Sequence, residues 1–211
     1  MIGILGGTFD PVHYGHLRTA TEVGKALDLD RILLIPLARP PHREPPVASA
    51  EQRLQMLQLA TKDFAQLEVN DCELRLGGVS YTVRTLEHLR HQFGHAVFCL
   101  IVGADAFLGL ESWHQWQRLF ELAHIVVMQR PGFDLGANLP SWAVPRLASS
   151  LTDLRAQTNG RIWIQPVTPI DISASTIRKA LARGESIEGK MPPAVLDYIK
   201  QQRLYAQQTG T

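Results

Sequence analysis

The chain has few cysteines and almost no excess of charge, and each scarcity excludes a class of protein. Only Cys72 and Cys99 occur in 211 residues, and they form no C-x-x-C pair, which argues against a disulfide framework and a zinc site. The net charge of +1 gives no support to non-specific nucleic-acid binding. No apolar run approaches the roughly 18 residues of a membrane span, and no basic leader precedes the first apolar residues. We therefore expect a soluble, cytoplasmic protein that binds neither membranes nor nucleic acid.

What the sequence does contain is an alternation of strand and helix patterns. Six short apolar runs predict strands, several of them continuous as in a buried parallel sheet, at residues 2–5, 32–35, 67–69, 97–102, 125–128 and 162–164. Helical patterns cover residues 15–28, 50–62, 81–93, 112–120, 141–152, 175–183 and 193–202, with Ser49 and Ser175 at the starts of two of them. This order predicts an α/β fold: a single domain over residues 1–211, with a Rossmann-like, mostly parallel sheet covered by helices on both faces over 1–170 and a small helical part over 171–211. The final helix shows only a packing pattern, and we expect no chemistry from it.

The first sixteen residues are the most informative. An apolar strand runs into Gly6-Gly7-Thr8-Phe9-Asp10-Pro11-Val12-His13-Tyr14-Gly15-His16. A buried strand that is followed by a glycine pair and the start of a helix presents backbone N–H groups to phosphate. His13 and His16 add two side-chain donors, and Gly15 lets a nucleotide approach the backbone closely. The alternative is a strand–turn–helix whose histidines only cap or pack.

A second string, Ile172-Ser173-Ala174-Ser175-Thr176-Ile177-Arg178, also favours an anion site. Hydroxyl groups and unpaired N–H groups at a helix start, with Arg178 one turn away, bind phosphate well. Taken alone, the string is equally well explained by a capped amphipathic helix.

Two proline- and glycine-rich loops follow predicted strands. Residues 36–46 hold five prolines and carry His42 and Arg43 on a stiff backbone, which fits either a ligand loop or a plain surface connection. Arg130 opens the second loop, which runs to Pro140.

The two strings resemble the H-x-G-H and S-x-S-T-I-R motifs of the nucleotidyltransferase superfamily, which is related to the class I aminoacyl-tRNA synthetases. Further segments resemble the bacterial nicotinate-nucleotide adenylyltransferase family. Pro40–Arg43 is similar to its P-P-H-K loop, and residues 80–85 are similar to its S-Y-T-x-D-T segment. Gly103–Asp105 is similar to its G-x-D site, Trp113 matches the tryptophan that follows that site, and residues 130–132 are similar to its R-P-G loop. Arg43 replaces the lysine of the first of these loops, and Arg84 stands where the second usually has aspartate.

The resemblance implies transfer of AMP from ATP to nicotinate mononucleotide, which gives deamido-NAD and pyrophosphate in NAD biosynthesis. It implies that His13 and His16 donate hydrogen bonds to the α- and β-phosphates and that Arg178 steadies the departing pyrophosphate. Other ATP-binding residues implied are Gly6, Gly7, Thr8, Phe9, Gly15, Gly103, Asp105, Ile172, Ser175 and Thr176. Those implied for the mononucleotide are Asp10, His42, Arg43, Thr82, Thr85, Trp113 and Arg130, with Trp113 stacking on the nicotinate ring. Mg²⁺ is expected to bridge phosphates without a cage of protein carboxylates.

Two other functions compete with this interpretation. A pantetheine-phosphate adenylyltransferase or a cytidylyltransferase would share both phosphate motifs, but the Pro-Pro-His-Arg loop, the Ser-Tyr-Thr segment and Trp113 argue against them. A nucleotide-sensing domain without activity would not need both intact motifs. The sequence leaves the oligomeric state open, and a homo-oligomer is compatible with it.

Overall fold

The computed structural model describes residues 1–39, 45–130 and 135–206, and within them the chain forms one parallel sheet of six strands. The strands are β1 (Ile2–Gly7), β2 (Arg31–Pro36), β3 (Leu67–Val69), β4 (Phe98–Gly103), β5 (His124–Gln129) and β6 (Ile162–Pro166), in the order β3-β2-β1-β4-β5-β6. Every neighbouring pair is parallel. This confirms the predicted Rossmann-like α/β fold and all six predicted strands, whose apolar runs are continuous because both faces of the sheet are covered.

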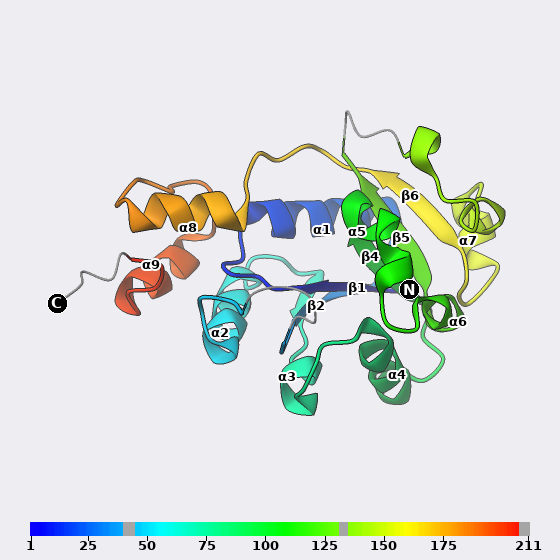
Figure 1. Cartoon of the computed structure of the whole chain (residues 1–211), viewed down its shortest axis with the longest axis horizontal. Coiled ribbons are helices and arrows are strands. Elements are labelled where there is room, and N and C mark those ends of the chain that lie inside the picture. The colour runs from blue at the N-terminus through cyan, green and yellow to red at the C-terminus, as the bar shows by residue number, and fades with distance from the viewer. Residues whose placement is uncertain (40–44, 131–134, 207–211) are drawn as a thin grey trace.

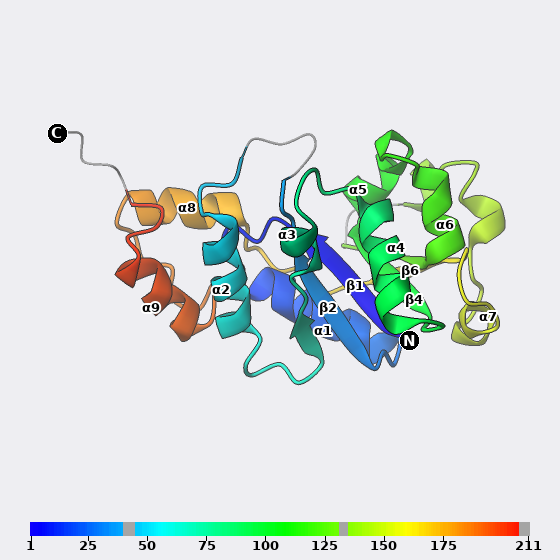
Figure 2. The same ribbon diagram turned by 90° about the horizontal axis from the view of Figure 1, so that it is seen from below.

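Helices cover both faces of the sheet (Figure 1). The longer ones are α1 (Tyr14–Ala26), α2 (Ala50–Ala60), α4 (Thr82–Phe93), α8 (Ala174–Ala182) and α9 (Pro193–Gln201), and shorter ones are α3 (Cys72–Leu76), α5 (Ala104–Leu108), α6 (Leu119–Leu122) and α7 (Leu151–Arg155). One buried apolar cluster joins the sheet to α1, α2, α8 and α9, and a second joins it to α3, α4, α5 and α6. Helices α2, α8 and α9 gather at the end of the molecule where the chain finishes (Figures 1 and 2).

Two predicted helices are wrong. Residues 112–120 form the end of one 3₁₀ turn (Leu110–Ser112), a second turn (Trp116–Arg118) and the start of α6, because the backbone is extended at Trp113 and left-handed at Gln115. This break lets the Trp116 ring pack 4.9 Å from that of Trp142. Residues 141–152 form a 3₁₀ turn (Val144–Arg146) and the start of α7, which Ser150 caps.

The helix caps are partly as predicted. Ser49 caps α2, where its hydroxyl accepts a hydrogen bond from the Gln52 N–H. Ser173 rather than Ser175 caps α8, because the extended backbone at Ser173 directs its hydroxyl to the Thr176 N–H at 3.2 Å. No helix among the described residues is long and apolar enough to cross a membrane.

Candidate active site

Several of the segments that the sequence singled out lie at the carboxyl ends of strands. The order of the sheet reverses between β1 and β4, and in open parallel sheets ligands bind in the crevice outside the strand ends at such a point. The turn over residues 8–16, called the histidine turn because it carries His13 and His16, follows β1, and Gly103–Asp105 joins β4 to α5 on the other side of this crevice. The proline-rich loop follows β2, Arg130 follows β5, and α8 follows β6. The fold therefore gathers the predicted site at one edge of the sheet.

The two histidines lie against each other at the start of α1. Their rings stack with centroids 3.8 Å apart, and the His13 backbone N–H donates to His16 Nδ1 at 3.4 Å. That contact leaves the His16 proton on Nε2 in the neutral ring, so Nε2–H is available as a donor. The His13 side chain is buried, and within the described residues its buried Nδ1 atom has no hydrogen-bond partner.

Both histidines are neutral near pH 7. Burial, and then the charge of Arg130, lowers the pKa of His13 to about 4. Burial, followed by the effects of His13 and Arg130, lowers the pKa of His16 to about 3. Arg130 is exposed, and its charge acts on both rings.

The two glycine positions of the turn are needed for close packing. A Cβ atom on Gly15 would lie 2.8 Å from His13 Nδ1 and 3.3 Å from the carbonyl oxygen of Ile172. A Cβ atom on Gly7 would lie 2.8 Å from the ring of Phe9, whose φ is +50°. Gly15 therefore lets the histidine turn and the segment before α8 come together.

Asp10 has a different environment from the one expected of a ligand contact. Its buried carboxylate accepts hydrogen bonds from the backbone N–H groups of Val47 at 2.8 Å and Ala48 at 3.1 Å, and from the Tyr205 hydroxyl at 2.6 Å. Protein groups therefore donate to both carboxylate oxygens of Asp10. The predicted contact with the mononucleotide would have to share these oxygens with the protein donors.

Helix α8 brings the second phosphate motif to the first. Ser175 and Thr176 are exposed at its start, and their hydroxyls lie 3.1 and 2.8 Å from the Ser173 hydroxyl. Arg178 reaches across to the histidine turn, where its Nη1 donates to the Asp10 carbonyl oxygen at 2.6 Å. This hydrogen bond joins residues that are 168 positions apart, so the two phosphate motifs are in direct contact.

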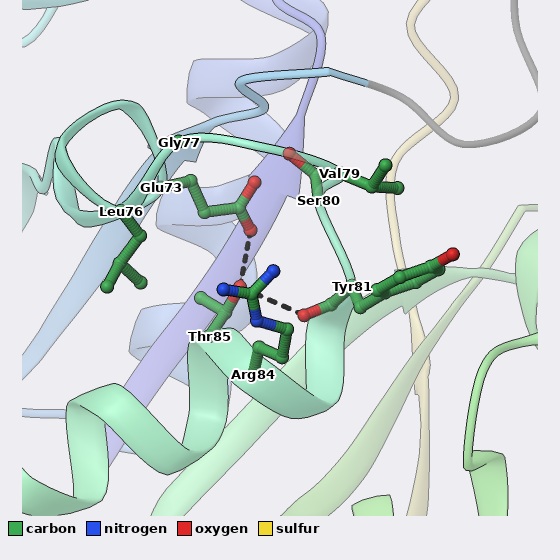
Figure 3. A pocket seen from close by; sticks show the side chains of 8 residues that line it. All are labelled: Glu73, Leu76, Gly77, Val79, Ser80, Tyr81, Arg84 and Thr85. Carbon is green, nitrogen blue, oxygen red and sulfur yellow. Dashed lines mark hydrogen bonds between the residues drawn. The ribbon is translucent and has the colours of Figure 1, made fainter.

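A small pocket lies between α3 and the start of α4 (Figure 3). The Thr85 side chain is buried and donates to Glu73 Oε1 at 2.6 Å, and Figure 3 shows these two side chains pointing toward each other. The other oxygen, Glu73 Oε2, is buried and has no partner among the described residues. The Arg84 and Thr85 N–H groups both donate to the Tyr81 carbonyl. Thr82 opens α4, and the first N–H groups of a helix lack intrahelical acceptors. Arg84 lines the pocket and is exposed.

The region around Trp113 joins this pocket to the segment after α5. Trp113 is partly buried against the apolar cluster, but it stands in extended backbone rather than on the expected helix. The ring of the neighbouring His114 lies 4.4 Å from that of Tyr81. A Cβ atom on Gly103 would lie 2.6 Å from Asp105 Oδ1, so the carboxylate folds back over the start of α5. His42 and Arg43 lie outside the described residues.

Sequence reasoning missed Arg53, Glu73 and Tyr205. Arg53 is almost fully buried and donates to the carbonyl oxygens of Thr8 at 2.9 Å and Leu37 at 2.8 Å. Its position on an amphipathic helix gave no signal, because arginine on a helix is normally solvated. Among the described residues no group of three or more histidine, cysteine or acidic side chains could hold a metal ion.

Comparisons with known proteins identify the family and support the fold. Residues 4–180 match the model of the "Cytidylyltransferase-like" family. The chain is 47% identical to a protein of Methylococcus capsulatus, over 98% of this chain and 100% of that protein, and 43% identical to one of Aeromonas hydrophila, over 97% and 96%; both are named "Probable nicotinate-nucleotide adenylyltransferase". Its fold matches that of the Plasmodium falciparum nicotinic acid mononucleotide adenylyltransferase complexed with NaAD, with a TM-score of 0.72 at 17% identity over 97% of this chain and 96% of that one. The chain therefore belongs to the cytidylyltransferase-like family and, within it, to the nicotinate-nucleotide adenylyltransferases.

Proposed function

We propose that the protein transfers AMP from ATP to nicotinate mononucleotide, forming deamido-NAD and pyrophosphate. The observation that carries the proposal is the pair of stacked histidines at the switch point of the sheet, together with the hydrogen bond by which Arg178 of α8 reaches the Asp10 carbonyl in the same turn. A neutral imidazole still has one N–H group, which can donate a hydrogen bond to a phosphate oxygen.

In the reaction a phosphate oxygen of the mononucleotide attacks the α-phosphorus of ATP. The bond from that phosphorus to the α–β bridging oxygen breaks, and pyrophosphate carries away the electron pair. No protein nucleophile is required, so the residues act by orienting two anions and by stabilising charge that develops in the transition state. His16 Nε2–H is one such donor, and the His13 ring, whose Nδ1 has no hydrogen-bond partner among the described residues, is the second.

Arg178 serves the leaving pyrophosphate. One of its N–H groups is held by the Asp10 carbonyl, which fixes the plane of the guanidinium and leaves other N–H groups for phosphate oxygens. Ser175 and Thr176 add exposed hydroxyls at the positive end of α8. Two further groups of residues lie on the ATP side of the site. The backbone of one group approaches the nucleotide closely: Gly6, Gly7, Thr8 and Phe9. The other group borders the nucleotide: Gly103, Asp105 and Ile172.

The mononucleotide occupies the side of the crevice near α4 and Trp113. The start of α4 at Thr82 offers N–H groups and a positive dipole end to the nicotinate carboxylate. Buried Thr85 shapes the floor of the pocket, and Trp113 stacks on the ring. His42, Arg43 and Arg130 bind the phosphate, and Asp10 contributes by holding the backbone that follows the loop of His42 and Arg43.

A divalent cation, Mg²⁺, neutralises phosphate charge when it is bound with ATP. Phosphates and water, rather than a cage of protein carboxylates, would hold this ion.

The experiment mixes protein, ATP and Mg²⁺ with nicotinate mononucleotide and follows pyrophosphate, with His16→Ala as a comparison. The wild-type protein releases pyrophosphate, and the variant loses about 100-fold or more in kcat, the scale for removing one preorganised donor. Near-normal turnover by a folded His16→Ala protein would remove the histidine turn from the mechanism. Absence of pyrophosphate release by the wild-type protein with this mononucleotide would refute the proposed reaction.

A further inference from the structure

Tyr205 links the end of the chain to the histidine turn. It follows α9, lies at the margin of the apolar cluster with 7% of its surface exposed, and donates its hydroxyl proton to Asp10 Oδ1 at 2.6 Å. The two residues are 195 positions apart. Its φ of +63° is costly for a residue with a side chain, so the surrounding packing must favour this position of the ring.

Asp10 connects Tyr205 to both parts of the site, the mononucleotide loop and Arg178. Its carboxylate also accepts the N–H groups of Val47 and Ala48, the backbone that follows the loop of His42 and Arg43. Its backbone carbonyl accepts the Arg178 guanidinium, whose Nη1 lies 4.0 Å from Asp10 Oδ2. A buried carboxylate needs several donors to remain ionised, and each missing donor is costly.

We propose that Tyr205 is a positioning residue for the mononucleotide: through Asp10 it fixes the backbone at Val47 and Ala48, and with it the end of the phosphate-binding loop. This inference rests on the proposed function, because it assumes that the loop binds the mononucleotide phosphate. Burial, together with the hydrogen bond to Asp10, raises the pKa of Tyr205 far above its ordinary value, so the hydroxyl remains a donor across the working pH range.

The proposal predicts which substrate is affected. The carboxylate of Asp10 holds the loop backbone, whereas Arg178 is held by the carbonyl of Asp10. Removing the Tyr205 hydroxyl should therefore raise the KM for the mononucleotide by about 3- to 10-fold, part of what a hydrogen bond to a charged group contributes. The KM for ATP should stay within about 2-fold, since the hydrogen bond to Arg178 is not removed.

The test compares Tyr205→Phe with Tyr198→Phe, which removes a hydroxyl from a partly buried tyrosine of α9. Both variants keep their aromatic ring, and melting temperatures are measured for each. Asp10→Asn and the double variant with Tyr205→Phe complete a cycle. If Tyr205 acts through Asp10, the double variant has the mononucleotide KM of Asp10→Asn alone.

Amide hydrogen exchange at Val47 and Ala48 gives a readout that does not depend on activity. We expect faster exchange at both amides in Tyr205→Phe and unchanged exchange in Tyr198→Phe. A Tyr205→Phe protein with wild-type mononucleotide KM and wild-type exchange, or one whose effects add to those of Asp10→Asn, would overturn the inference. Lack of pyrophosphate release by the wild-type protein would instead refute the proposed function, and the exchange result would still decide whether Tyr205 holds this backbone.

Discussion

Replacing Gly15 by alanine separates catalysis from stability at the histidine turn. The added Cβ would lie 2.8 Å from His13 Nδ1, 2.9 Å from His13 Cε1 and 3.3 Å from the Ile172 carbonyl oxygen. His13 is 5% exposed and its ring is stacked on His16, so the added Cβ would push the His13 ring out of this stacked position.

The magnitudes of the two effects differ. Alanine favours a helix over glycine by about 1 kcal/mol, which offsets part of the roughly 1–3 kcal/mol that overpacking costs. The net loss of stability should therefore be about 2 kcal/mol or less, and the protein stays folded at 25 °C. Displacement of one preorganised donor costs about 100-fold in kcat/KM.

The assay is steady-state release of pyrophosphate, with melting temperature measured beside it. Gly109→Ala is the control, because its Cβ would meet nothing closer than 3.7 Å. We expect near-normal activity from the control and the large loss from Gly15→Ala. A Gly15→Ala protein within about 3-fold of wild-type kcat/KM would show that the tight contact with His13 does not matter for the chemistry, since the donor loss predicted here is far larger.

Three further predictions concern other parts of the site. Arg178→Lys should lower kcat by about 10-fold or more, because lysine cannot reproduce the planar guanidinium fork; kinetics unchanged by lysine would contradict this role. Trp113→Ala should raise the KM for the mononucleotide by about 5-fold or more, the scale of losing ring stacking, and leave that for ATP nearly unchanged; the reverse pattern would place the wrong substrate beside Trp113. The pKa values of His13 and His16 are about 4 and about 3 in the folded protein against an ordinary 6.5, so between pH 6.5 and about 4 the unfolded chain binds more protons than the folded protein. The free energy of unfolding should thus fall as pH falls from 6.5 to about 4, and urea titrations of the His13→Asn/His16→Asn protein should show a shallower dependence.

The strands and the phosphate-binding segments were predictable because their signals are local. Continuous apolar runs marked the sheet, and the strings at the ends of β1 and β6 carried glycine, histidine and hydroxyl residues at fixed spacing. The helix predicted over 112–120 failed because packing of Trp116 against Trp142 outweighs helix propensity there. Asp10 lay in the motif, but its partners come from positions 47, 48 and 205, and no local pattern reveals contacts at that distance.

The most direct test of the central claim is the choice between the two mononucleotides. With ATP and Mg²⁺, nicotinate mononucleotide and nicotinamide mononucleotide are compared by pyrophosphate release, and the dinucleotide product is identified by mass. We expect one molecule of deamido-NAD for each pyrophosphate released. We also expect kcat/KM to be at least about 10-fold higher for nicotinate mononucleotide, since one charge-assisted hydrogen bond of about 1.5 kcal/mol suffices for that ratio. Equal use of the two mononucleotides, or preference for the amide, would contradict it.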